Sequence, residues 1–180
     1  MNLPNALSFL RILAVPAFIW LVLEAHPQAA LWLFAIAGIT DALDGFIAKR
    51  FNMVTELGGY LDPMADKALL LAGFVTLSVM GQIPLWLVLI VVTRDLVIIG
   101  GAVVFQVVTG ALRMEPLWIS KVNTVMQMVL LCVVLLQGVR GGLEEVLLVL
   151  MLLTAGTTIT SGWLYVVRWS RLAVLQEEKG

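Results

Sequence analysis

Four aspartates stand close together in a chain that otherwise consists largely of hydrocarbon side chains: Asp41, Asp44, Asp62 and Asp66. Spacings of three and four residues place each pair on one face of a helix. A carboxylate inside a bilayer costs about 2.5–3.5 kcal/mol on insertion scales, so four are tolerated only with positive charge between them. Because carboxylate oxygens are ligands of hard cations, this stretch predicts a site for one or two divalent ions, Mg²⁺ or Mn²⁺.

The composition sets the class of protein in which this site must be built. Of the 180 residues, 61% are hydrophobic and 13% are charged, and the mean hydropathy is +1.03. Soluble domains do not have this composition, so we expect an integral membrane protein with a single domain over residues 1–180. The net charge of −1, without any basic run, predicts no nucleic-acid partner.

Six apolar segments of about 20 residues, the length that crosses ~30 Å of hydrocarbon, organise the chain. They are expected at residues 6–23, 29–49, 60–80, 85–108, 118–136 and 146–169. Asp41 and Asp44 then lie near the end of the second segment, and Asp62 and Asp66 near the start of the third. The sequence predicts an all-α integral membrane protein built as a bundle of six transmembrane helices.

The distribution of basic residues predicts the orientation of this bundle. If six spans alternate, Arg140 falls on one side, and eight basic residues fall on the other: Arg11, Lys49, Arg50, Arg113, Lys121, Arg168, Arg171 and Lys179. The basic side is cytoplasmic by the positive-inside rule. Both termini and the active site near the aspartates are therefore expected at the cytoplasmic interface. The short chain, without long tails, favours a bacterial inner membrane over an organelle.

Two basic residues lie where they could bind an anion. Arg94 is followed by Asp95 well inside the fourth segment, where the alternative is an internal ion pair, and Lys121 opens the fifth segment, where the alternative is a side chain that reaches the interface. Both are expected to face the aspartates and to hold a phosphate. The small polar residues around Thr154–Ser161 are expected to form a helix-packing face.

The aspartates belong to a longer pattern with fixed spacing, Asp41-x2-Asp44-Gly45-x2-Ala48-Lys49-x8-Gly58-x3-Asp62-x3-Asp66. This pattern resembles the signature of the CDP-alcohol phosphotransferase family. In that family six membrane helices carry the signature on the second and third helices, so the resemblance covers the whole chain. Lys49 stands where the family has arginine, and lysine offers a phosphate a point charge in place of a two-pronged donor.

The resemblance implies a role for each residue of the pattern. Asp41, Asp44 and Asp62 are expected to ligate two divalent cations, and Asp66 to ligate one of them and to act as the catalytic base. The residues expected to contact the cytidine nucleotide or its pyrophosphate are Asp41, Gly45, Lys49, Gly58 and Asp62. Family members are commonly homodimers, so a homodimer is expected here too.

Further stretches resemble the CMP-forming cardiolipin synthases within that family, among them Pro4-Asn5 with Arg11, Leu61-Asp62-Pro63, Thr93-Arg94-Asp95 and the segment around Lys121. Related phosphatidylglycerophosphate synthases usually have Arg-Glu where this chain has Arg94-Asp95. The resemblance implies transfer of a phosphatidyl group from CDP-diacylglycerol to a hydroxyl of phosphatidylglycerol, with release of CMP. Arg94 and Lys121 would then bind the acceptor phosphate.

Three alternatives stay open at this point. The same chemistry with glycerol 3-phosphate as acceptor would make phosphatidylglycerophosphate. A cation transporter would also use intramembrane aspartates, but its site usually lies near the bilayer midplane between internal repeats, and this chain shows no repeat. A non-catalytic membrane scaffold would not need four aspartates at fixed spacing.

Overall fold

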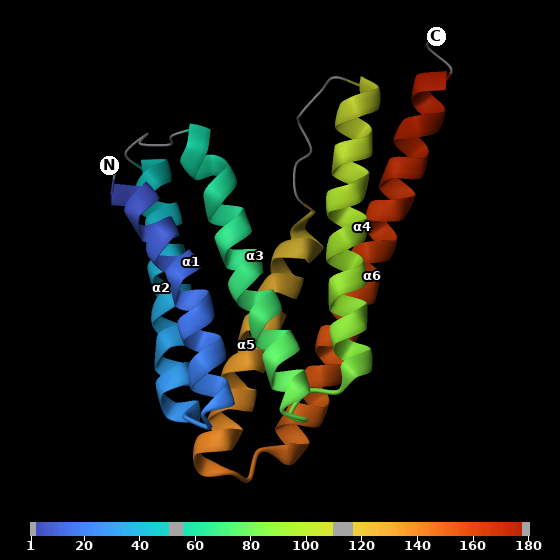
Figure 1. Cartoon of the computed structure of the whole chain (residues 1–180). Helices are drawn as coiled ribbons and strands as arrows, with labels where there is room; N and C mark the ends of the chain where they lie inside the picture. Colours follow the sequence, from blue (N-terminus) through green and yellow to red (C-terminus); the bar gives the residue numbers. More distant parts are fainter. Residues whose placement is uncertain (1–2, 51–55, 110–116, 178–180) are drawn as a thin grey trace. The chain divides into compact units, whose positions relative to one another are not determined.

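A computed structural model describes the backbone of residues 3–50, 56–109 and 117–177, and the side chains of residues 10–40, 67–101 and 117–168. Within these ranges the chain forms six α-helices and no strand (Figure 1). The helices are α1 Leu3–Leu23, α2 Pro27–Arg50, α3 Glu56–Val79, α4 Leu85–Thr109, α5 Trp118–Arg140 and α6 Glu144–Glu177. The predicted all-α architecture is confirmed, with one helix for each predicted apolar segment.

Two of the described helices are long and apolar enough to cross a membrane by themselves. These segments are Trp118–Arg140 and Glu144–Arg168, with mean hydropathies of 2.0 and 1.7. The described residues also include shorter apolar helical stretches at Leu10–Leu23, Pro27–Thr40 and Lys67–Val79. Together with the composition, these helices identify a membrane protein, while a bundle of six spans remains a prediction.

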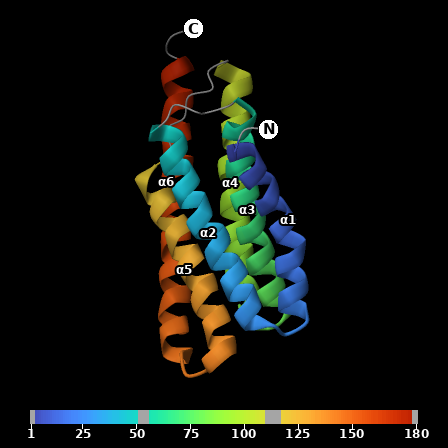
Figure 2. The ribbon, with the colours of Figure 1, turned by 90° about the vertical axis from the view of Figure 1, so that its left-hand side faces the viewer.

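The chain divides into two compact units, which are described separately. Unit 1 comprises Met1–Pro84 and Met128–Leu147, and unit 2 comprises Leu85–Gln127 and Leu148–Gly180. In unit 1, α1 packs against both α2 and α3 (Figures 1 and 2). All four aspartates of the sequence pattern belong to unit 1, whereas Arg94 and Lys121 belong to unit 2. The predicted single domain over residues 1–180 stays a prediction.

Unit 1 has a core of large apolar side chains. The rings of Phe18 and Phe34 join α1 to α2, with centroids 5.7 Å apart and planes inclined by 50°, which is a favourable aromatic geometry. On α3, Gly73 allows close contact with α5, because a Cβ placed there would lie 2.8 Å from Cδ1 of the fully buried Leu131. The close packing of α3 against this half of α5 therefore depends on a missing side chain.

The turn between α1 and α2 is tightly fixed. Ala25 has φ of 54°, the N–H of His26 donates to the carbonyl of Leu21 at 2.9 Å, and the N–H of Ala25 donates to that of Val22 at 3.1 Å. This pair of bonds is a Schellman motif, usually completed by glycine because of its positive φ. Pro27 then starts α2 at a position where the missing N–H costs nothing.

The turn between α5 and α6 is held by one side chain. Gln137 Nε2 donates to Glu144 Oε1 at 2.7 Å, and the N–H of Leu143 donates to Gln137 Oε1 at 2.6 Å. Gly141 and Gly142 supply positive φ angles of 69° and 73°.

α5 extends beyond the apolar segment expected at residues 118–136. Gly138 lies inside α5, which continues to Arg140. A Cβ at Gly138 would lie 3.0 Å from Cβ of Pro27, so this glycine lets the start of α2 approach α5. Apolar packing here outweighs the helix-weakening effect of glycine, which is about 1 kcal/mol relative to alanine.

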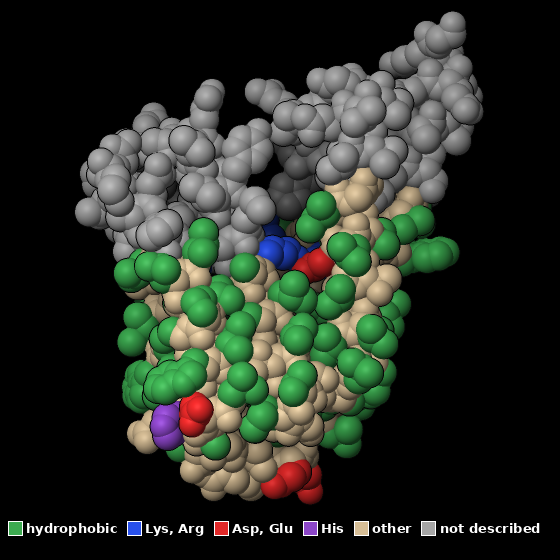
Figure 3. All heavy atoms as spheres, in the orientation of Figure 1, with side chains coloured by type: hydrophobic (Ala, Val, Ile, Leu, Met, Phe, Trp, Pro, Cys, Tyr) green, Lys and Arg blue, Asp and Glu red, His purple; other side chains and the backbone are tan. Residues whose placement is uncertain are grey.

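The described surface is largely apolar. In the face shown in Figure 3, hydrophobic side chains cover much of the described part, and acidic side chains gather at its lower end. Leu96, Leu148 and Trp163 are among the large apolar residues that are more than half exposed. The exposure of many large apolar side chains fits helices that face lipid.

We expect Gly73→Leu to destabilise unit 1 by about 1–3 kcal/mol, because an overpacked core forces its neighbours to shift. The measurement is the midpoint temperature for loss of helical ellipticity in detergent. The matched control is Gly156→Leu, since Gly156 is exposed and an added Cβ would meet nothing within 4 Å. Equal midpoints for the two variants would contradict the close α3–α5 packing.

Candidate functional site

The residues of the aspartate pattern lie on two consecutive helices. Asp41 and Asp44 are on α2, and Asp62 and Asp66 are on α3. Their side chains lie outside the described ones, so their expected roles stay predictions. The helical backbone nevertheless gives each pair a common face, because residues three and four apart are neighbours on a helix.

The structure changes the expected ends of these two helices. The sequence predicts a polar connection over residues 50–59, but α2 continues through Arg50 and α3 already begins at Glu56. Gly58 is therefore a helical residue, despite the low helix propensity of glycine. Since α2 continues through Arg50, positions 49 and 50 are about 100° apart around the helix. Gly45 and Lys49 lie on the same helix as Asp41 and Asp44.

Four aspartates on two helices form a donor set that fits divalent cations. Carboxylate oxygens suit hard ions such as Mg²⁺ and Mn²⁺. Among the side chains that the structure describes, no group of three or more His, Cys, Asp or Glu could hold a metal ion. The expected metal site at the four aspartates lies outside the described side chains and stays a prediction.

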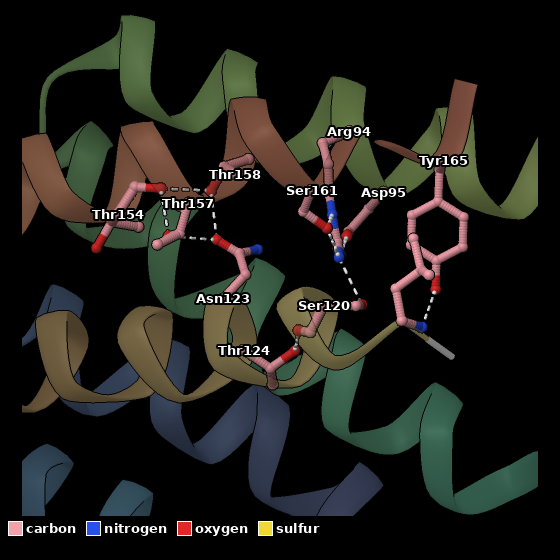
Figure 4. Close-up of polar contacts among 11 residues, drawn as sticks. Arg94, Asp95, Ser120, Asn123, Thr124, Thr154, Thr157, Thr158, Ser161 and Tyr165 are labelled. Carbon is pink, nitrogen blue, oxygen red and sulfur yellow. Dashed lines mark hydrogen bonds and ion pairs between the residues drawn. The ribbon is translucent and has the colours of Figure 1, made fainter. Parts of the chain in front are cut away.

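Unit 2 contains a buried polar centre around Arg94, which is only 5% exposed (Figure 4). Its Nη2 donates to Ser120 Oγ at 2.6 Å and to Ser161 Oγ at 2.7 Å, and its Nε donates to Ser161 Oγ at 3.3 Å. Its Nη1 forms an ion pair of 2.6 Å with Asp95 Oδ1. The guanidinium of α4 is thereby held by residues of α4, α5 and α6.

Close packing helps to fix this guanidinium. A Cβ placed at Gly162 would lie 3.4 Å from Cγ of Arg94, so the small residue leaves room for the arginine stem to lie against α6. Tyr165 on the next turn of α6 accepts a hydrogen bond on its hydroxyl from the N–H of Leu117, at 3.2 Å. The start of α5 is thus tied to α6 both at Leu117 and, through Arg94, at Ser120.

A second buried cluster lies beside the first. Thr157 Oγ1 and Thr158 Oγ1 hydrogen-bond Asn123 Oδ1 at 2.9 Å and 2.7 Å. Thr158 Oγ1 also lies 2.6 Å from the carbonyl oxygen of Thr154. A hydroxyl has one proton to donate, so it cannot satisfy both acceptors at once. Asn123 Nδ2 and Gln127 Nε2 are buried without a hydrogen-bond partner among the described residues. The cluster therefore contains two amide groups that can still donate hydrogen bonds.

The two helices that build this region carry matching polar stripes. On α5 and α6 the members recur at i, i+3, i+4 and i+7: Ser120, Asn123, Thr124 and Gln127; Thr154, Thr157, Thr158 and Ser161. That period places each set on one helix face. The expected packing face on the sixth segment is therefore polar and makes specific hydrogen bonds. The period places Ser161 on this polar face, but it does not show that Ser161 contacts Arg94.

The two expected phosphate-binding residues differ in their surroundings. Arg94 is buried and makes the ion pair with Asp95 that the sequence offered as an alternative. Lys121 is exposed on α5, and no described residue pairs with it. The assignment of both residues to an acceptor phosphate stays a prediction.

Comparison with known proteins gives the family. The family model described as CDP-alcohol phosphatidyltransferase matches residues 1–167. A cardiolipin synthase (CMP-forming) of Rattus norvegicus is 35% identical over 181 residues, covering 91% of this chain and 60% of the relative. A probable phosphatidylglycerophosphate synthase of Mycobacterium tuberculosis (strain ATCC 25618 / H37Rv) is 33% identical over 174 residues, covering 93% of this chain and 81% of the relative.

These similarities identify the family of the protein. The chain belongs to the CDP-alcohol phosphatidyltransferase family. A cardiolipin synthase (CMP-forming) of Streptomyces coelicolor is a further relative, 39% identical over 109 residues, or 56% of this chain and 51% of the relative. The chain spans about 60% of the length of the rat relative. The family resemblance drawn from the aspartate pattern is confirmed.

We expect Ser161→Ala to lower the stability of unit 2 by about 1.5–3 kcal/mol, the usual cost of losing a hydrogen bond to a charged group. The substitution removes the acceptor of two Arg94 nitrogens. Thermal unfolding in detergent measures the effect. Thr160→Ala is the matched control, because the hydroxyl of exposed Thr160 donates to the Gly156 carbonyl of its own helix at 2.7 Å and contacts no other helix among the described residues. A Ser161 variant as stable as the control would contradict this role.

Proposed function

We propose that the chain is a CMP-forming cardiolipin synthase. It transfers the phosphatidyl group of CDP-diacylglycerol to a hydroxyl of phosphatidylglycerol and releases CMP. The observation that carries this proposal is the aspartate pattern, with all its fixed residues on the consecutive helices α2 and α3 of one unit. The similarity to a cardiolipin synthase over 91% of the chain supports the choice of acceptor.

The proposed setting is a bilayer. All six helices would span it, with the aspartates near the cytoplasmic interface and both termini in the cytoplasm of a bacterium. Two copies of this chain would form a homodimer, by analogy with the family. The apolar described surface and the two helices able to cross a membrane support this setting.

Asp41, Asp44, Asp62 and Asp66 would hold two divalent cations, either Mg²⁺ or Mn²⁺. When bound, these ions supply positive charge that offsets the negative charge developing on the leaving phosphate. Asp41, Gly45, Lys49, Gly58 and Asp62 would bind the cytidine nucleotide and its pyrophosphate. Glycine at two of these positions permits close approach of the backbone to the ligand.

Asp66 would act on the acceptor hydroxyl. The hydroxyl oxygen bonds to the phosphatidyl phosphorus, the anhydride bond to CMP breaks, and Asp66 takes the hydroxyl proton. A carboxylate with a low pKa is a weak base, so its contribution rests on proximity and orientation. Arg94 and Lys121 of unit 2 would bind the phosphate of the acceptor, with Lys121 as an exposed point charge.

Asp66→Asn is expected to reduce transfer at least a hundredfold, since general-base catalysis typically contributes 10²–10⁴-fold, while helical content stays unchanged. CMP release from purified protein measures the rate, and circular dichroism measures the fold. Glu145→Gln is the matched control: it removes one negative charge outside the aspartate pattern and should leave the rate unchanged. Turnover by the Asp66 variant at the wild-type rate would remove this residue from the mechanism.

The acceptor assay tests the proposal as a whole. Purified protein receives CDP-diacylglycerol and Mg²⁺ with either phosphatidylglycerol or glycerol 3-phosphate, and the lipid product is identified by mass spectrometry. We expect cardiolipin with the first acceptor and no product with the second. Product only with glycerol 3-phosphate would replace the proposal by phosphatidylglycerophosphate synthesis, which the Mycobacterium tuberculosis relative favours by its name.

A further inference from the structure

We propose that Asn123 is a positioning residue, which holds Arg94 in place through Ser161. This inference rests on the proposed function, in which Arg94 binds the phosphate of the acceptor. Asn123 lies on α5 and is fully buried, and all three residues belong to unit 2. Two features of unit 2 support this role: the register of α5 against α6, and the hydrogen-bonding groups that its buried clusters leave unused.

Helices α5 and α6 pair in an antiparallel register that places Asn123 next to the Arg94 centre. Arg94 Nη2 lies between Ser120 of α5, at 2.6 Å, and Ser161 of α6, at 2.7 Å. Three residues onward along α5 and three back along α6, Asn123 Oδ1 lies 2.7 Å from Thr158 Oγ1. The two clusters are therefore consecutive layers of one interface, separated by about 4.5 Å along the helix axis.

The hydrogen bonds around Asn123 leave two groups unused. Its Oδ1 faces Thr157 and Thr158, whereas its Nδ2 points away from them and has no partner among the described residues (Figure 4). Ser161 Oγ accepts from both Nε and Nη2 of Arg94, which occupies its two lone pairs. The proton of this serine has no acceptor in the part of the chain that the structure describes.

Turning the Asn123 amide by 180° uses both groups. The oxygen and the NH2 group of a carboxamide have nearly the same shape, so the turned amide occupies the same space. Nδ2 then donates its two hydrogens to the hydroxyls of Thr157 and Thr158, and these hydroxyls donate their own protons to carbonyls one turn back on α6. Oδ1 now faces the Arg94 side and accepts the Ser161 proton, directly or through one bridging water.

The result is a continuous polar network of Thr158, Asn123, Ser161 and Arg94. Each member has a hydrogen-bond partner, and a satisfied buried network fixes its side chains more firmly than isolated pairs do. Because Asn123 holds the proton of Ser161, both lone pairs of this serine are directed at the guanidinium. Removing the amide frees the Ser161 hydroxyl to rotate and loosens its hold on Arg94.

The position of the guanidinium matters because little of its hydrogen-bonding capacity is left for a ligand. Arginine has five N–H groups, and Ser120, Ser161 and Asp95 accept from four of those of Arg94. The fifth, on Nη1, has no partner among the described residues and is left for the acceptor phosphate. A single donor binds well only at the right distance and angle, so a displaced Arg94 loses affinity for the acceptor.

A double-mutant cycle in the acceptor assay tests this role. Asn123→Leu removes the amide at similar volume, Ser161→Ala removes the hydroxyl through which it acts, and the double variant combines them. Gln127→Leu is the matched control, because Gln127 is an equally buried amide one turn further along α5 and lies outside the network. KM is measured from CMP release, once with phosphatidylglycerol varied and once with CDP-diacylglycerol varied. Asn123→Ala replaces the leucine variant if circular dichroism shows lost helix.

We expect Asn123→Leu and Ser161→Ala each to raise KM for phosphatidylglycerol about tenfold, and to change kcat and KM for CDP-diacylglycerol by less than about twofold. The double variant should match Ser161→Ala, because Asn123 then has nothing left to hold. Gln127→Leu should match the wild type. An unchanged KM in Asn123→Leu, equal rises in both KM values, or multiplied effects in the double variant would overturn the positioning role and leave the proposed function in place.

Thermal unfolding of the same variants in detergent tests the link between Asn123 and Ser161 without turnover. We expect the double variant to lose less stability than the sum of the two single losses, because the two residues belong to one network. Simple addition would overturn the link. Wild-type protein that releases no CMP with phosphatidylglycerol would overturn the proposed function, and the unfolding cycle alone would then decide whether Asn123 acts through Ser161.

Discussion

A buried positive charge sets the main constraint on unit 2. Arg94 is surrounded by apolar helices, and a guanidinium left there without partners would cost several kcal/mol. Ser120, Ser161 and Asp95 satisfy it from three helices. The two serine contacts require α4, α5 and α6 to keep their registers, because sliding one helix by a single residue would move its polar stripe off the common face. Polar contacts thus fix positions that apolar packing alone would leave variable.

Much of the architecture could be predicted from the sequence, because long apolar runs between polar breaks favour helices. Apolar runs near 20 residues gave all six helices, and polar or glycine-rich breaks gave their turns. The errors arose at Gly58 and Gly138, where glycine suggests a break but the chain is helical. At Gly138 the reason is tertiary: the absent side chain lets Pro27 approach, and this contact is not visible in a local pattern.

The candidate site could likewise be predicted from the sequence only in part. The aspartate pattern could be predicted because its chemistry depends on residue type and spacing along two helices. The surroundings of Arg94 could not, because the sequence does not show which serines meet it across 26 and 67 residues. The i, i+3, i+4, i+7 stripes on α5 and α6 carried the relevant signal, but small polar residues at that period also serve ordinary helix packing.

The turn held by Gln137 bears on how the chain enters the bilayer. Its hydrogen bonds join residues only six and seven positions apart, and contacts this local close quickly and with little loss of chain entropy. The helices on either side, α5 and α6, are the two described helices that are long and apolar enough to cross a membrane alone. The last third of the chain can therefore enter the membrane as a preformed hairpin, without waiting for the helices that carry the aspartates.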